Sequence, residues 1–350
     1  MRTFACVCGN MLFFENAGCV ACGREVGWCP VCRGLNALLP QDDGWFRCGN
    51  PDCGAVLGKC VNYAQHNVCN RCVTVEGGQP TAALCDCCRF NETIPDLSVA
   101  GNQQKWARLE AAKRRLFYTL DLLRLPRGRA EDGFDPPLAF DFKADVIPEG
   151  GLWRTMGAAE RAYTGHAGGK ITINIKEADD VERERLRVDL GEAHRTVIGH
   201  FRHEIGHYYW DLLVRGRHED AFTALFGDHL NPSYDDALER YYRDGPPPDW
   251  RIRYVSAYGA SHPWEDWAET FAFYLDMVSV LDTAANMAVT APAPLHDLAA
   301  MIDRYRRIGV VVNEMNRDMG LKDLVPEVLN RATIEKLAFI DRLVRRAGAG

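Results

Sequence analysis

The sequence of 350 residues has no cysteine beyond Cys88, although it contains 14 cysteines in all. It also has no apolar run close to the ~18 residues that a membrane-spanning helix needs, and no charged-then-apolar leader opens it. A formal net charge of −7 argues against a dominant nucleic-acid surface. With 47% apolar and 25% charged residues, wholesale disorder and fibrous structure are excluded. We therefore expect a globular, soluble, cytoplasmic protein with no membrane partner.

The cysteines concentrate in a head that we bound at residues 1–98. Short strand-like pieces, broken by glycine, proline and cysteine, leave this region too little apolar surface to fold unaided. In a reducing cytosol, closely spaced cysteine pairs favour metal binding over disulfides or redox chemistry. We predict a zinc-ribbon region, because bound zinc would supply the missing stability.

Cys-x-x-Cys spacings within the head indicate structural zinc sites, because two such turns place four thiolates around one ion. We expect the first site to join Cys6, Cys8, Cys19 and Cys22. A second site could join Cys29, Cys32, Cys48 and Cys53. A third site has His66 and six cysteines as candidates, among which spacing does not choose: Cys60, Cys69, Cys72, Cys85, Cys87 and Cys88. We expect one to three structural zinc ions.

Helical periodicity follows the head. Apolar residues at three- and four-residue spacing predict a connecting helix over 103–125, inside a linking region at 99–126. Alternating residues predict strands at 138–142 and 170–175. Further helices are expected at about 192–214, 264–281, 295–319 and 333–347. Residues 127–350 are thus expected to form an α+β domain with a small sheet and a helical C-terminal lobe.

The helix predicted over 192–214 carries the motif His203-Glu204-x-x-His207. The two imidazoles are four residues apart on one helical face, so both can bind one ion. Glu204 lies beside them and can take a proton from water that zinc has acidified. His200 is on the same helix, but three ligands in a row along one axis cannot close around an ion. We interpret His200 as a core or supporting residue.

A third ligand is needed, and two carboxylates in a later helix are the candidates. Glu265 and Glu269 lie one helical turn apart. One of them can bind zinc while the other accepts the outer ring N–H of a ligating histidine. The usual enrichment of acidic residues at a helix start explains Glu265 and Asp266, but not Glu269.

This pattern resembles the gluzincin metallopeptidases, in which a glutamate on a later helix is the third zinc ligand. The spacing from Tyr258 to Glu265 and Glu269 is similar to that in anthrax lethal factor. The resemblance implies that Glu265 binds the catalytic zinc, that Glu269 supports the ligands and that Tyr258 stabilises the oxyanion. Asp211, four residues after His207, matches a structural acid of the gluzincin helix.

Nearly the whole chain resembles a bacterial family of zinc-binding metallopeptidases with an N-terminal zinc ribbon. Long stretches at 60–63, 91–98, 164–175, 199–210 and 262–269 carry this resemblance. It implies a structural zinc site with four ligands, Cys60, Cys69, Cys85 and Cys88. Cys72 and Cys87 would then be spare cysteines that bind no zinc. The pairs Cys29/Cys32 and Cys48/Cys53 depart from the commoner pattern of that family.

We therefore predict a zincin-like, gluzincin-type metallopeptidase that hydrolyses peptide bonds in peptides or proteins, with Glu204 as general base. The strand at 171–175 is expected beside the active helix, where an edge strand could pair with an extended peptide; a plain sheet strand is equally compatible. His166 is expected to be a turn residue.

The alternative functions are a zinc-ribbon adaptor or nucleic-acid-binding protein with a structural or vestigial zincin domain, and a hydrolase of non-peptide amides. The ribbon could serve substrate or partner recognition.

Overall fold

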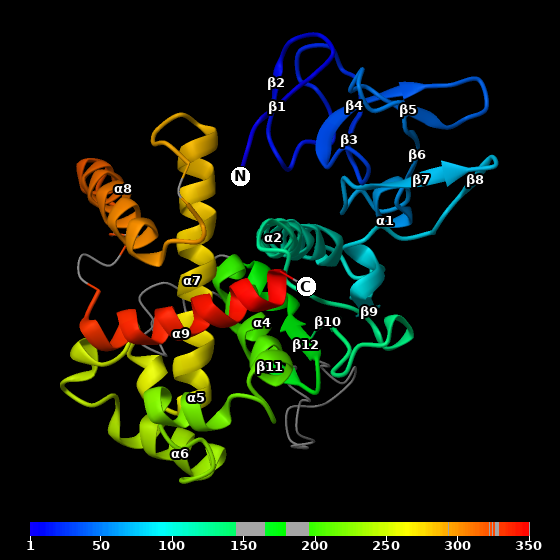
Figure 1. Ribbon diagram of the computed structural model, residues 1–350. Helices are drawn as coiled ribbons and strands as arrows, with labels where there is room; N and C mark the ends of the chain where they lie inside the picture. The colour runs from blue at the N-terminus through cyan, green and yellow to red at the C-terminus, as the bar shows by residue number, and fades with distance from the viewer. Residues whose placement is uncertain are drawn as a thin grey trace.

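The chain folds into a β-rich N-terminal head above a mostly helical body (Figure 1). The structure is a computed structural model that describes residues 1–144, 165–179, 196–292, 294–321, 323, 325 and 329–349. Within these residues, no helix combines the length and the apolar character that crossing a bilayer requires.

The head is built from short antiparallel strands separated by cysteine- and glycine-rich turns. A two-stranded sheet pairs β1 with β2, and a six-stranded sheet has the order β3-β4-β5-β6-β7-β8. A single short helix, α1 (Val61–Ala64), follows β6. The strands are β1 (Phe4–Ala5), β2 (Met11–Leu12), β3 (Val26–Cys29), β4 (Gly34–Pro40), β5 (Phe46–Cys48), β6 (Val56–Lys59), β7 (Cys72–Glu76) and β8 (Gln79–Pro80).

The body contains a mixed sheet with the order β11-β12-β10-β9. Its strands are β9 (Asn91–Thr93), β10 (Ala139–Lys143), β11 (Gly165–Ala167) and β12 (Lys170–Asn174). Of the two roles left open for the strand at 171–175, the edge strand is wrong and the plain sheet strand is confirmed, because β12 pairs with β10 on one side and with β11 on the other. Among the described strands, β11 takes the edge position, and β9 reaches this sheet from the end of the head.

The predicted helices form with shifted ends. They are α2 (Asn102–Leu122), α4 (Val197–Leu213), α7 (Pro263–Asn286), α8 (Leu298–Asp318) and α9 (Arg331–Gly348). Residues 192–195 of the helix predicted over 192–214 lie outside the described residues. Two further helices, α5 (Glu219–Phe226) and α6 (Tyr234–Asp244), were not predicted. Both α8 and α9 pack against α7, and α9 crosses it (Figure 1).

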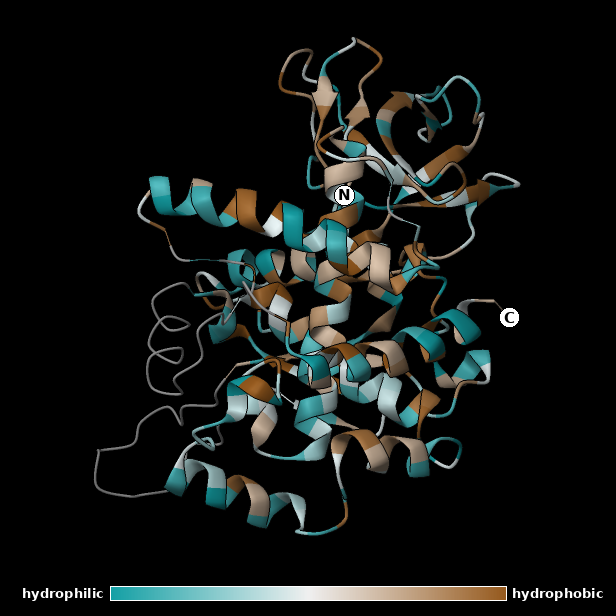
Figure 2. Ribbon diagram, turned by 60° about the vertical axis from the view of Figure 1, so that its left-hand side comes forward, coloured by the Kyte–Doolittle hydropathy of each residue, from teal (hydrophilic) through white to brown (hydrophobic). Residues whose placement is uncertain are grey.

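The buried side chains form one large cluster and one small one. The large cluster runs without a break from the later cysteines of the head, through α2, to the sheet and helices of the body. The small cluster surrounds Cys6 and Cys19 and includes Trp28. Near the first cysteines, apolar side chains such as Phe13 and Val20 are exposed, and the outer loops of the head carry brown stretches in Figure 2.

Candidate metal centres

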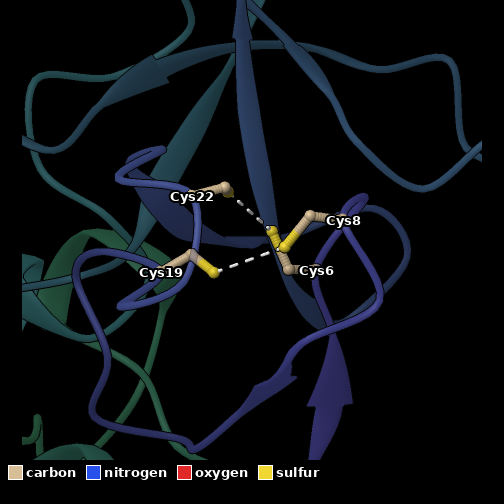
Figure 3. Close-up of side chains that lie close together, drawn as sticks. All are labelled: Cys6, Cys8, Cys19 and Cys22. Carbon is tan, nitrogen blue, oxygen red and sulfur yellow. Dashed lines mark hydrogen bonds between the residues drawn. The ribbon is translucent and has the colours of Figure 1, made fainter.

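Three groups of four cysteines gather in the head, each with its sulfur atoms within 4.8 Å of one another. In the first group the sulfurs turn toward a common centre (Figure 3), with Cys6–Cys22 and Cys8–Cys19 separations of 3.7 Å. Four sulfurs about 2.3 Å from a zinc ion form a tetrahedron with edges of about 3.8 Å. These separations therefore fit a shared ion, and they are much longer than the ~2.05 Å of a disulfide bond.

The second group has the same dimensions. The sulfurs of Cys29 and Cys53 are 3.7 Å apart, and those of Cys32 and Cys48 are 3.8 Å apart. The structure thus brings together the four cysteines whose pairs depart from the commoner family pattern. The donor set fits zinc as well as the first one does.

The third group consists of Cys60, Cys69, Cys85 and Cys88. Backbone N–H groups of Arg71, Cys85 and Cys88 donate to the sulfurs of Cys69, Cys60 and Cys85, as expected for thiolates. The spare residues Cys72 and Cys87 and the alternative ligand His66 lie outside the group. The geometry thus selects, among the candidates that spacing left open, the four cysteines that the family resemblance implies.

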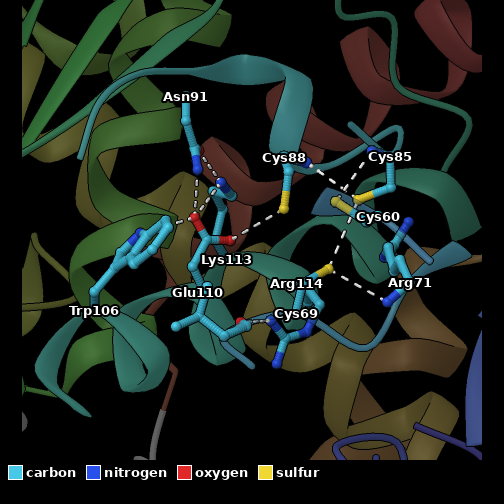
Figure 4. A network of polar contacts seen from close by, with 11 residues as sticks. Cys60, Cys69, Arg71, Cys85, Cys88, Asn91, Trp106, Glu110, Lys113 and Arg114 are labelled. Atoms are coloured by element: carbon cyan, nitrogen blue, oxygen red, sulfur yellow. Dashed lines mark hydrogen bonds and ion pairs between the residues drawn. The ribbon is translucent and has the colours of Figure 1, made fainter. Parts of the chain in front are cut away.

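The third group adjoins a buried polar network on α2. In Figure 4 it lies between Arg71 and the Glu110–Lys113 pair. The side chains of Glu110 and Lys113 are both fully buried and 2.9 Å apart, and Glu110 also accepts from Trp106 and Asn91. The Cys88 sulfur is 3.9 Å from Glu110 Oε2. This network connects the cysteine centre to the body of the molecule.

Replacing a spare cysteine and a grouped cysteine should have different effects on metal content. We expect Cys85→Ala to bind one zinc ion fewer than wild type, because three thiolates remain where four are needed. Cys87→Ala should keep the wild-type number, although Cys87 is equally buried. Native mass spectrometry of both variants counts the ions, and equal counts would contradict the assignment.

In the body, the close crossing of α4 and α7 sets the geometry of the fourth candidate centre. A Cβ atom at Gly206 would lie 3.0 Å from the Cα of Ala268, so glycine allows the two helices to approach. Trp267 Nε1 donates to the Gly206 carbonyl over 2.8 Å at the same crossing. The contact places the first turns of α7 beside the motif residues of α4.

Three side chains converge at this crossing: His203, His207 and Glu265. The Nε2 atoms of the two histidines are 3.3 Å apart, and Glu265 Oε2 is 2.9 Å from His203 Nε2. Ligand atoms about 2.0–2.1 Å from a tetrahedral zinc ion are about 3.3 Å from one another. The spacing of the donor atoms therefore suits a zinc ion.

The hydrogen bonding of His203 supports the same conclusion. Its Nδ1 is 2.6 Å from Glu269 Oε1, so that nitrogen carries the proton and, in the neutral ring, Nε2 presents a lone pair. Burial opposes charge on His203, yet the carboxylates of Glu265 and Glu269 raise its pKa well above the usual range. The pocket thus favours positive charge at Nε2, either as a proton or as a metal ion.

Glu204 and Tyr258 lie next to these residues. Glu204 is buried, and burial raises its pKa above the ordinary glutamate value, which makes it a stronger base. The Tyr258 ring packs against the His203 ring at 5.9 Å between centroids. Burial, and next Glu265, raise the pKa of Tyr258, so its hydroxyl stays protonated and can donate.

The remaining predicted residues lie around the crossing. Asp211 of α4 pairs with Arg215, just beyond the end of the helix, and is 3.9 Å from His166 Nε2, so its contacts are structural. His166 stacks on His207 at 6.1 Å and accepts from the backbone N–H of Gly169. Burial lowers the pKa of His166 to about 3, which keeps it neutral. His200 lies away from the ligand atoms, with Nδ1 3.2 Å from Glu177 Oε2.

Comparison with known proteins gives this arrangement a context. The profile of a family described as "Putative zinc-binding metallo-peptidase" matches residues 102–343, and that of a zinc-ribbon domain matches residues 3–99. The chain belongs to this metallopeptidase family. Uncharacterized proteins of Mycobacterium tuberculosis (strains CDC 1551 and H37Rv) and Mycobacterium bovis are each 38% identical to it over 358 residues. The alignment covers 98% of this chain and 95% of each relative. No solved structure matches the chain.

Within the metallopeptidase region, sequence reasoning missed Tyr234. Its hydroxyl donates to Glu265 Oε1 over 2.6 Å, from the first residue of α6. The available signal was Ser233, followed three residues later by Asp236, since serine at this position commonly caps a helix. The Ser233 hydroxyl does accept from the backbone N–H of Asp236. The surrounding polar, proline-rich sequence hid this helix start.

Proposed function

We propose that the protein is a zinc-dependent peptidase of the gluzincin type, with its active site at the crossing of α4 and α7. The observation that carries the proposal is the convergence of Glu265 with His203 and His207, although Glu265 is almost sixty positions away in the chain. We further propose that this site holds one catalytic zinc ion and that the three cysteine groups hold three structural ions.

Each side chain at the crossing has a defined task in this proposal. His203, His207 and Glu265 would hold the ion, which when bound polarises water and the substrate carbonyl. Glu204 accepts the proton of the attacking water and delivers it to the leaving amine. Tyr258 donates a hydrogen bond to the oxygen that becomes negatively charged. Glu269 fixes the ring of His203 through its Nδ1–H.

Tyr258 suits the donor task because its hydroxyl is available. Among the residues that the structure describes, no hydrogen bond engages the Tyr258 hydroxyl, whereas that of Tyr234 is used by Glu265. The Tyr258 ring is held between His203 and Tyr241, with centroid distances of 5.9 Å to each. A ring that is held in this way presents its hydroxyl with little loss of entropy on binding.

A proteome-derived peptide library tests the activity directly. We expect the full-length protein to cleave peptides, and a chelator to stop the cleavage until zinc is restored. A library left intact by the zinc-loaded protein would contradict the proposal. Tight protein or nucleic-acid binding without cleavage would instead favour the zinc-ribbon adaptor function.

Removing the carboxylate ligand tests the metal assignment. We expect Glu265→Ala to lose the catalytic ion and keep the ions of the cysteine groups, so that the zinc count falls by one. A matched control is Glu335→Ala on α9, because that carboxylate is half-exposed and, among the described residues, forms its ion pair with a surface arginine, Arg331. Atomic absorption on dialysed samples gives both counts, and an unchanged count for Glu265→Ala would remove Glu265 from the site.

A further inference from the structure

We propose that Tyr234 is a positioning residue that holds Glu265 as a one-oxygen ligand of the metal and so keeps one coordination position open. The proposal rests on the proposed function, because it takes Glu265 as a ligand. It concerns a residue of α6 that lies outside the motif and outside the α7 stretch with which the motif converges.

The two carboxylate oxygens of Glu265 have different environments. Oε1 accepts the Tyr234 O–H at 2.6 Å. Oε2 is buried and, within the described residues, accepts no hydrogen bond, but lies 2.9 Å from His203 Nε2. Two lone pairs facing each other at this distance repel unless a cation lies between them. Oε1 also lies 3.6 Å from His207 Nε2, but it is engaged by the tyrosine. Oε2, which is closer to a histidine nitrogen and has no hydrogen bond among the described residues, is therefore the oxygen that we assign to the ion.

Packing fixes the tyrosine in this position. The Tyr234 ring makes an edge-on contact with His262, whose ring centroid is 5.1 Å away, and lies 6.1 Å from Trp264. His262 caps the start of α7 by accepting from the backbone N–H of Trp264. The hydroxyl is thus held by the same helix start that carries Glu265, although Tyr234 itself belongs to α6.

The consequence for a catalytic ion is its coordination number. A catalytic zinc site has three protein ligands and leaves the next position to water or substrate. A glutamate that bound through both oxygens would occupy the space that this position needs. By engaging Oε1, Tyr234 keeps Glu265 to a single bond with the ion. This accounts for a tyrosine hydroxyl that is directed at a proposed ligand.

Cobalt substitution in the full-length protein tests the role. A mild chelator removes the catalytic ion, a zinc count shows that the cysteine groups keep theirs, and Co²⁺ is then added. Four-coordinate Co²⁺ absorbs visible light more strongly than Co²⁺ of higher coordination number, so the bands report geometry. The compared proteins are wild type, Tyr234→Phe, Tyr118→Phe as a hydroxyl-loss control on α2, where the hydroxyl donates to Asp282, and Glu265→Ala as the baseline.

We expect Tyr234→Phe to bind Co²⁺ with weakened visible bands, because the released Oε1 joins the ion, while Tyr118→Phe keeps the wild-type spectrum. Peptide hydrolysis by Tyr234→Phe should fall about 10- to 100-fold. A wild-type spectrum for Tyr234→Phe would overturn the proposal and leave the peptidase function standing. Another outcome separates the two proposals. If wild type shows the cobalt bands and Tyr234→Phe loses them, but wild type cleaves no peptide, only the peptidase function is contradicted.

A second measurement needs no variant and covers the case in which Tyr234→Phe folds poorly. A crystal structure of the zinc-loaded wild type should show one Glu265 oxygen on the ion and the other on the Tyr234 hydroxyl. Two Glu265 oxygens at bonding distance from zinc would overturn the proposal.

Discussion

Glu204→Gln is expected to lose about 10²- to 10⁴-fold in kcat while it keeps its full complement of zinc. Glutamine has nearly the same shape, so the packing of α4 should persist, but its neutral amide cannot accept the proton of the attacking water. Glu204 is next to a proposed ligand in the chain and is not one of the three proposed ligands, His203, His207 and Glu265. The loss should therefore appear in the rate and not in the metal count.

The measurement combines peptide hydrolysis with atomic absorption on the same samples. Glu314→Gln is a suitable control, because that carboxylate is on α8 with an exposed fraction of 61%. Its rate should equal that of wild type. A Glu204→Gln protein that hydrolyses peptides at the wild-type rate would show that another group acts as the base.

Lys113→Ala is expected to destabilise the protein by about 3–5 kcal/mol, which is the typical cost of breaking a buried ion pair from one side. The side chains of Lys113 and Glu110 are fully buried. Burial by itself would lower the pKa of Lys113, but Glu110 raises it above the usual lysine value, so the lysine is charged. Truncation would leave the Glu110 charge unpaired, 3.9 Å from the Cys88 sulfur.

Urea unfolding of the zinc-loaded protein measures this loss. Arg307→Ala is the matched control, because the Arg307–Asp303 pair is exposed (78% and 60%). Such surface pairs contribute at most about 1 kcal/mol. Combining Lys113→Ala with Glu110→Gln removes the unpaired charge and should recover part of the loss. If Lys113→Ala cost no more than Arg307→Ala, the buried pair would have no special structural role.

Features set by local spacing could be predicted well from the sequence. The Cys-x-x-Cys turns and the two histidines one turn apart depend on neighbouring residues alone, so their geometry follows from the motif. The start of α7 was also readable, because Pro263 suits the first position of a helix. That Glu265 reaches the histidines depends on the α4–α7 crossing, which the family resemblance implied and local spacing did not.

Features set by tertiary contacts were missed. The position of β12 inside the sheet depends on β11, and three residues such as Gly165–Ala167 give too short a pattern to predict a strand. Helix α6 is a different case, because its sequence does carry a helical signal: Tyr234, Ala237, Leu238, Tyr241 and Tyr242 recur at three- and four-residue spacing. The polar, proline-rich sequence around it obscured that signal. The choice of Cys60, Cys69, Cys85 and Cys88 over their neighbours was left open by spacing and came only from the family resemblance, because it is set by folding.

The unbroken apolar cluster that joins the later cysteines to α2 and the body has a consequence for how the molecule comes apart. Side chains that share one interior lose their neighbours together, so this part of the head and the body should melt as one cooperative unit in calorimetry. The small cluster around Cys6 and Cys19 is separate from the large one and contacts α2 through Tyr118, so we expect this segment to open first. A protease should therefore cleave the chain around Cys6 and Cys19 well before it cleaves the rest of the protein.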